Sequence, residues 1–81
     1  RGGNSLQPGF VRMPYGDLGE TAANFLGALV SLTPGTTTVD IDPERRELLL
    51  HLLDMTRAEQ TLAAIRRDFL TPVRTLFGGK P

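Results

Sequence analysis

The sequence predicts an α+β domain in the order β-α-β-β-α, with a three-stranded mixed sheet and two helices on one of its faces. Apolar residues recur at helical spacing in 18–32 and 58–69. The segment 36–42 alternates and is rich in β-branched residues, as strands are. Because the chain has 81 residues, we expect one small domain, a size class that buries only about 60% of its unfolded surface.

Residues 1–9 contain glycine, proline and polar side chains, and predict a flexible lead-in. A single domain is expected over 10–81, opening with a short strand from Phe10 to Met13 that Pro14 closes. The chain does not begin with Met, so we expect it to be a piece of a longer protein.

The first helix is predicted after Asp17, whose side chain can cap it, with Glu20 at the capping-box spacing. Its apolar residues are Leu18, Ala22, Phe25, Leu26, Leu29, Val30 and Leu32. Pro34 and Gly35 then form a structural turn, because Pro-Gly suits the central pair of a type II turn.

The next two strands, 36–42 and 47–54, form a hairpin in which Asp42 faces Glu47. This register gives the sheet one apolar face, made of Val39, Ile41, Leu48, Leu50 and Leu52. The other face is mixed and holds Thr38, Asp40, Asp42, Glu47, Leu49, His51 and Leu53. The third strand is apolar on both faces, so we place it at the centre, antiparallel to two strands that run parallel to each other. This is a split β-α-β arrangement with a right-handed crossover.

The second helix is predicted to begin with a capping box made by Thr56 and Glu59. Its apolar stripe is Ala58, Leu62, Ile65 and Phe69. Pro72 is expected to end or kink this helix, with a brief continuation over 73–77 that Gly78-Gly79 ends.

No motif for catalysis or for a cofactor is present, and the aspartates and the single histidine lack the spacing of calcium or zinc sites. We therefore expect no enzyme activity, no cofactor and no metal. His51 is diagonal to Asp40 in the predicted register, and the pair is a candidate pH-sensitive site. Leu49 and Leu53 lie on the uncovered face, where an apolar patch indicates an interface with a neighbouring subunit, a second copy or the membrane.

Acidic and basic residues are equal in number, nine of each, which disfavours a nucleic-acid binder. The middle of the chain, 15–55, is acidic, and the two ends are basic. Arg66, Arg67 and Arg74 are candidates for contact with lipid head groups or with acidic partner surfaces.

The chain resembles the E subunit of the Mrp/Mnh-type multisubunit sodium/proton antiporters. The resemblance is carried by Leu-Thr-Pro-Gly-Thr at 32–36, Thr-Val-Asp at 38–40, His51 and Leu-Asp at 53–54, and it extends from about residue 10 to about residue 77. Leu48-Leu49-Leu50 departs from the family, in which β-branched residues are frequent before the histidine.

The resemblance implies a protein with amino-terminal membrane helices and a soluble domain on the cytoplasmic side of the bacterial plasma membrane. It implies other antiporter subunits as partners, and an ion path carried by larger subunits. We therefore expect an accessory or assembly domain of a sodium/proton antiporter. A small dimeric ligand-sensing or enzyme-like domain is the alternative. An RNA-binding module ranks last, because only Phe10 and Tyr15 offer aromatic rings near the sheet.

Overall fold

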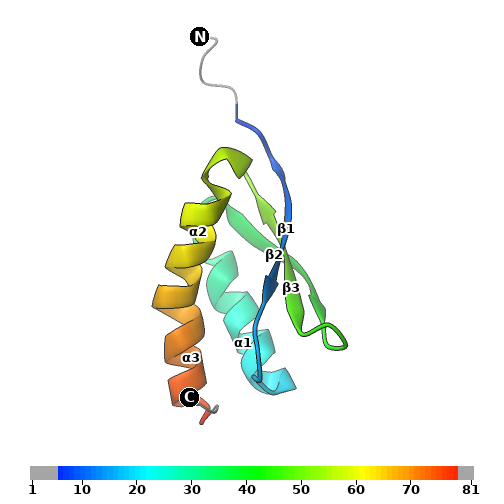
Figure 1. Ribbon diagram of the computed structural model, residues 1–81, viewed down its shortest axis with the longest axis vertical. Helices are drawn as coiled ribbons and strands as arrows, with labels where there is room; N and C mark the ends of the chain where they lie inside the picture. Colours follow the sequence, from blue (N-terminus) through cyan, green and yellow to red (C-terminus); the bar gives the residue numbers. More distant parts are fainter. Residues whose placement is uncertain (1–5, 79–81) are drawn as a thin grey trace.

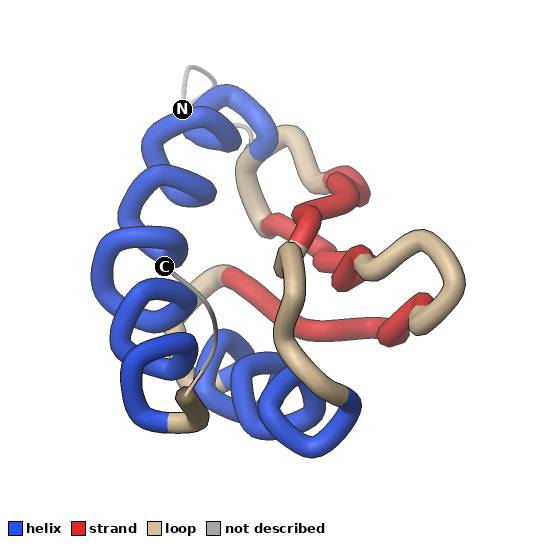
Figure 2. The backbone as a smooth tube through the Cα atoms, turned by 60° about the horizontal axis from the view of Figure 1, so that its bottom comes forward, coloured by secondary structure: helices blue, strands red, loops and turns tan. Residues whose placement is uncertain are grey.

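Strands and helices pack as two layers in the computed structural model, which describes residues 6–78. The strands are β1 (Gly9–Pro14), β2 (Thr36–Asp42) and β3 (Glu47–Leu52). The helices are α1 (Glu20–Ser31), α2 (Ala58–Ile65) and α3 (Thr71–Leu76). The helices gather on one side of the sheet (Figures 1 and 2), which confirms the predicted α+β class.

The strand order is β1-β3-β2, so the third strand is central, as the sequence predicts. β1 and β2 both run antiparallel to β3 and are therefore parallel to each other, with β3 between them. The split β-α-β arrangement agrees with the prediction. The sheet is not mixed, however, because both pairs of neighbouring strands are antiparallel.

The hairpin register agrees with the prediction only at the turn end. Asp42 faces Glu47 and Ile41 faces Leu48, but a β-bulge between Thr38 and Asp40 shifts the remaining pairs by one residue. Val39 is the extra residue, and its side chain is 50% exposed rather than buried. The prediction that Val39 belongs to the core is therefore wrong, because a bulge reverses the alternation beyond it.

The bulge turns Thr38 towards α1. Its hydroxyl donates to the carbonyl of Gly27 at 2.8 Å, and its backbone N–H donates to the hydroxyl of Ser31 at 3.0 Å. Helix and strand approach closely here, since a Cβ at Gly27 would lie 3.3 Å from Thr38 Cγ2 and 3.4 Å from Ile41 Cδ1. The Ser31 hydroxyl at the end of α1 thus accepts a hydrogen bond from a backbone N–H of the edge strand β2.

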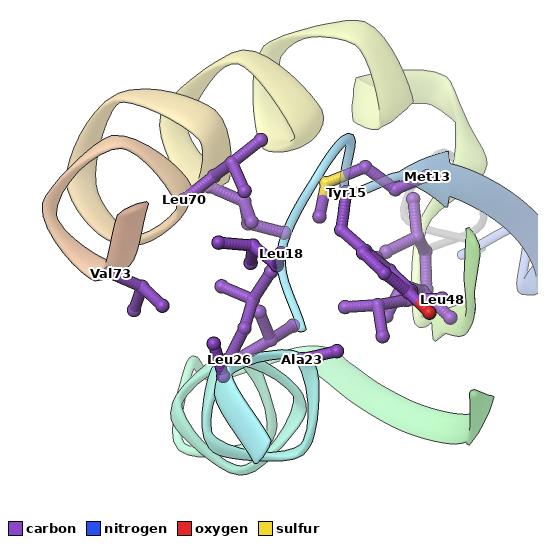
Figure 3. Packing of buried hydrophobic residues seen from close by; sticks show 13 residues of the cluster. Met13, Tyr15, Leu18, Ala23, Leu26, Leu48, Leu70 and Val73 are labelled. Carbon is purple, nitrogen blue, oxygen red and sulfur yellow. The ribbon is translucent and has the colours of Figure 1, made fainter. Parts of the chain in front are cut away.

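The core lies between the two layers and draws on every element of the sheet. Leu48, Leu50 and Leu52 of β3 are at most 2% exposed and point at the helices. Figure 3 shows Met13, Tyr15 and Leu48 meeting the side chains of the helices in one cluster. Burying one such leucine contributes about 1.5–3 kcal/mol, so alternate residues of β3 supply much of the stability.

The first helix begins at Glu20, and its N-cap is Gly19, without a side-chain cap. The predicted capping box of Asp17 and Glu20 is therefore wrong. The hairpin turn explains the later start: the guanidinium of Arg46 donates to the carbonyl of Leu18 at 3.1 Å and to that of Gly16 at 3.3 Å. These bonds hold the connection between β1 and α1 in a non-helical form.

The second helical segment is capped by Asp54 instead of Thr56. A 3₁₀ turn, Met55–Arg57, precedes α2, and the Asp54 carboxylate accepts from the N–H of Thr56 at 3.1 Å and from its hydroxyl at 2.7 Å. The predicted capping box of Thr56 and Glu59 is wrong, because Thr56 donates its hydroxyl to a better acceptor. Glu59 lies in the first turn of α2, where a negative charge suits the helix dipole.

Pro72 neither ends nor sharply breaks the helical path. A π-helical turn, Arg66–Leu70, joins α2 to α3, and the N–H of Thr71 donates to the carbonyl of Arg66, five residues earlier. A proline ring clashes with the carbonyl four residues before it in a regular α-helix. The wider π turn accommodates Pro72, which explains a continuous helix where the sequence predicted an end or kink.

The predicted turn at Pro34 and Gly35 is present. Gly35 has φ 83°, and the N–H of Thr36 donates to the carbonyl of Thr33 at 3.1 Å. The carbonyl of Gly35 accepts from the N–H of Leu53 at 2.9 Å, so the turn also anchors the end of β3. Within the predicted lead-in, Gln7 accepts from the N–H of Met55, whereas residues 1–5 lie outside the described part of the chain.

Candidate interaction surface

The sheet face that no helix covers among residues 6–78 is the candidate functional surface. Directly paired residues share a face, and Leu48, Leu50 and Leu52 occupy the helix side. The opposite side, called the outer face below, consists of Phe10, Arg12, Pro14, Thr37, Asp40, Asp42, Glu47, Leu49 and His51.

One end of the outer face is apolar. The ring of Phe10 is 60% exposed and packs edge-on against His51, with ring centroids 5.1 Å apart and an interplanar angle of 66°. Leu49 is half-buried beside them, and Leu53, just past the strand, is 49% exposed. The sequence predicts Leu49 and Leu53 as interface residues. The structure places Leu49 on the outer face and Leu53 just past the end of β3, and their role in an interface stays a prediction.

The other end of the outer face carries charges. Asp42 accepts from the backbone N–H groups of Glu44 at 3.0 Å and Arg45 at 3.1 Å, which fixes its carboxylate in the hairpin turn. Arg12 lies 3.9 Å from Glu47 Oε1, too far for a hydrogen bond. That buried Glu47 oxygen has no hydrogen-bond partner within the described part of the chain.

The candidate pair His51 and Asp40 shares the outer face but is not in direct register. His51 faces Thr37 on one side and Phe10 on the other, whereas Asp40 faces Leu49. The sequence places His51 opposite Thr38, and the bulge at Val39 accounts for the difference. The two residues remain diagonal neighbours, a spacing that long side chains span. Their pH sensitivity stays a prediction.

The candidate basic residues of the second helical segment are partly engaged within the chain. Arg67 makes two contacts with the Asp68 carboxylate, at 2.9 and 3.1 Å, which lower the pKa of Asp68 and raise the pKa of Arg67. Arg74 lies 3.4 Å from Asp17 and ties α3 to the loop before α1. Arg66 is exposed. Contact of these arginines with a membrane surface stays a prediction.

A groove of about 440 Å³ opens between the end of α1 and the α2 side of the helical layer. It is mainly apolar, and its polar contributors are Thr33, Thr61 and Asp68. Thr33 Oγ1 is buried without a hydrogen-bond partner among the described residues. Across residues 6–78, no three His, Cys, Asp or Glu side chains gather closely enough to hold a metal ion. No helix in the same range is long and apolar enough to cross a bilayer.

Two features of this surface do not follow from the sequence reasoning. Arg12 is not among the predicted site residues, although the alternation of Phe10, Val11, Arg12 and Met13 places it beside Phe10 on the outer face. Tyr15 is expected as an aromatic ring near the sheet, but it is 3% exposed and belongs to the core. Phe10 is therefore the aromatic ring that the described outer face offers.

Comparisons with known proteins agree with the resemblance found in the sequence. The model of a family described as Na⁺/H⁺ ion antiporter subunit matches residues 1–76. The chain is 29% identical over 65 residues to the E subunit of the Na⁺/H⁺ antiporter of Alkalihalophilus pseudofirmus, and 31% identical over 65 residues to the E subunit of Bacillus subtilis. Each match covers 80% of this chain and 41% of the relative.

A chain in the structure of the Mrp complex from Dietzia sp. DQ12-45-1b has the same fold, with a TM-score of 0.67 and 29% identity. That match covers 84% of this chain and 64% of the other, so the chain spans under two thirds of the length of each of these relatives. The relatives are named as subunits of ion antiporters, which are transporters rather than enzymes, and this agrees with the prediction of no enzyme activity.

Proposed function

Because the chain belongs to the family of E subunits of Mrp/Mnh-type Na⁺/H⁺ antiporters, we propose that it is an accessory domain of a multisubunit Na⁺/H⁺ antiporter. In this proposal the domain lies on the cytoplasmic side of the membrane and holds neighbouring subunits together. It carries no part of the ion path, and its partners are other subunits of the same complex.

The partly apolar outer face carries this proposal. Phe10 is 60% exposed on the outer face, which has no covering layer in the described chain, and Leu53, just past the end of β3, is 49% exposed. Small monomers rarely leave contiguous apolar surface in water, and such surface marks interaction sites. Burying the exposed part of each side chain would contribute about 1 kcal/mol, half of the full burial of a large apolar residue.

The arrangement of polar groups also suits a subunit interface. Interfaces have an apolar centre and a polar rim. On the outer face, Leu49 and the ring pair of Phe10 and His51 are bordered by Arg12 and Asp40 on the flanking strands. β3 is central and rigidly paired on both edges, so these side chains are presented on a fixed platform.

Co-purification of the antiporter complex tests the proposal. Leu53→Ser and Phe10→Ser, made together in the intact subunit, should remove it from the purified complex while its unfolding temperature changes little. The matched control is Leu76→Ser, because Leu76 is 73% exposed at the end of α3, away from the outer face. If the double variant is retained in the complex at the level of the control, the proposed role of the domain in holding subunits together is contradicted.

A further inference from the structure

The outer face is polarised along β3, and its two ends favour different chemistry. Glu47, Leu49 and His51 follow one another on this face, from the hairpin turn towards Leu53. Glu47 is flanked by Asp42, whereas His51 is flanked by Phe10. Any partner that covers the whole face meets carboxylates at one end and apolar side chains at the other.

The carboxylates at the hairpin end outnumber the cations that share the face. Asp42 is already held by the amides of its own turn and lies 3.8 Å from Arg45. The Asp40 carboxylate has no hydrogen bond or ion pair among the described residues, and the buried Glu47 Oε1 has Arg12 at 3.9 Å but no hydrogen bond. A buried acceptor without a donor is costly, by about 1–3 kcal/mol, so Glu47 favours a partner that brings a cationic donor.

We infer that the outer face binds an amphipathic helix of a neighbouring subunit, and that this helix carries a Lys or Arg about two and a half turns from its apolar residues. The inference rests on the proposed function and names the chemistry of the partner. Glu47 and His51 are four residues apart in a strand, about 13 Å at about 3.3 Å per residue. The same distance spans about nine residues, or two and a half turns, of a helix.

The shape of the surface favours a helix over a strand. A helix covers the face of a sheet, whereas an added strand pairs with its edge. At the β2 edge, the bulge at Val39 and the bond from the Thr38 N–H to the Ser31 hydroxyl obstruct strand addition. Phe10, by contrast, is 60% exposed and is paired with His51 on the face itself.

The charges argue against two other occupants. An anionic bilayer would be repelled by the carboxylates of Asp40 and Glu47. A second copy would bring Asp40, Asp42 and Glu47 again with one further Arg12, so the excess of carboxylates over arginines on the outer face would double in the interface. Burying that excess without a cationic partner is strongly unfavourable.

Photo-cross-linking within the assembled complex tests the inference. A benzoylphenylalanine placed at Pro14, beside Glu47, reports on the acidic end, and one placed at Leu53 reports on the apolar end. Mass spectrometry should show that both probes cross-link to the same helix of another subunit. The residue cross-linked by the probe at position 14, called the Pro14 adduct, should have a Lys or Arg within one helical turn. Asp40→Asn with Glu47→Gln should lower the Pro14 adduct about fivefold or more, whereas the control Asp68→Asn, on the helical layer, should leave it unchanged.

The outcomes separate this inference from the proposed function. An adduct of Leu53 with another subunit, combined with a Pro14 adduct on a segment that lacks Lys and Arg, overturns the inference and leaves the assembly role standing. Adducts on lipid or on a second copy of the chain also overturn it. Absence of adducts at both positions, in a complex that retains the subunit, removes the outer face as an interface and both proposals with it.

Discussion

Two single substitutions at the β-bulge, Thr38→Val and Val39→Thr, have effects on stability that depend on the register of β2. In the structure, the hydroxyl of Thr38 is partly buried and donates to the carbonyl of Gly27 at 2.8 Å. Thr38→Val removes this hydrogen bond, for which we expect a loss of about 1 kcal/mol in the free energy of unfolding. Val39 is 50% exposed, so Val39→Thr should cost less than about 0.5 kcal/mol.

A regular hairpin without the bulge predicts the reverse order. Val39 would then face the core, and Val39→Thr would bury a hydroxyl without a partner at a cost of about 1–3 kcal/mol. Thr38 would point to solvent, and Thr38→Val would be close to neutral. The two variants thus distinguish the registers by the sign of their difference.

Urea unfolding followed by circular dichroism measures both costs. A small domain loses about 1 kcal/mol of stability per molar urea, so Thr38→Val should lower the midpoint by about 1 M, and Val39→Thr by less than half of that. A larger loss for Val39→Thr than for Thr38→Val would refute the bulged register and the contact between β2 and α1.

The remaining predictions concern the core and the helix cap. Leu50→Ala should lower the free energy of unfolding by about 2–5 kcal/mol, because Leu50 is fully buried, whereas Leu49→Ala should cost less than half as much. Urea unfolding measures both losses, and equal losses would contradict the assignment of the two residues to opposite faces of the sheet. The hydroxyl of Thr56 and then its N–H lower the pKa of Asp54, so the carboxylate stabilises the fold above the ordinary aspartate pKa of about 3.9. This stabilisation is lost as the pH falls through the lowered pKa. The difference in free energy of unfolding between the parent chain and Asp54→Asn should therefore narrow from about pH 5 to about pH 2. A difference that stays constant over this range would argue against the cap.

The sequence predicts the layers of this fold well because burial is periodic in it. The alternation of Leu48, Leu50 and Leu52 with polar or outward residues defines the core face, and all three are buried. The double-sided apolar character of this segment also predicts its central place in the sheet, which the strand order confirms. These features depend on many residues at once, so no single local contact reverses them.

The features that the sequence did not predict depend on single contacts between distant residues. The bulge at Val39 depends on Thr38 meeting Gly27, and the start of α1 depends on Arg46 holding the carbonyl of Leu18. Asp54 competes with Thr56 for the cap, and a sequence pattern does not show which side chain donates. Local propensity ranks such alternatives closely, and tertiary contacts decide between them.

The candidate surface likewise has features that the sequence predicts and features that it does not. Leu49 and Leu53 are predicted as interface residues from alternation alone, and the structure adds the edge-on contact between Phe10 and His51. The sequence pattern does not show that Glu47 Oε1 lacks a hydrogen bond or that backbone N–H groups hold Asp42 in its turn. Both features depend on the geometry of the hairpin. The chemistry expected of the partner therefore depends on the structure and does not follow from the sequence pattern.

Hydroxyl-radical footprinting of the outer face tests the central claim most directly. Oxidation of Phe10 and Leu53 should be several-fold slower in the assembled antiporter than in the free chain, whereas Leu76, which is 73% exposed at the end of α3, should react at the same rate in both. Equal oxidation of Phe10 and Leu53 in the two states would contradict the claim that this face joins the domain to its neighbours.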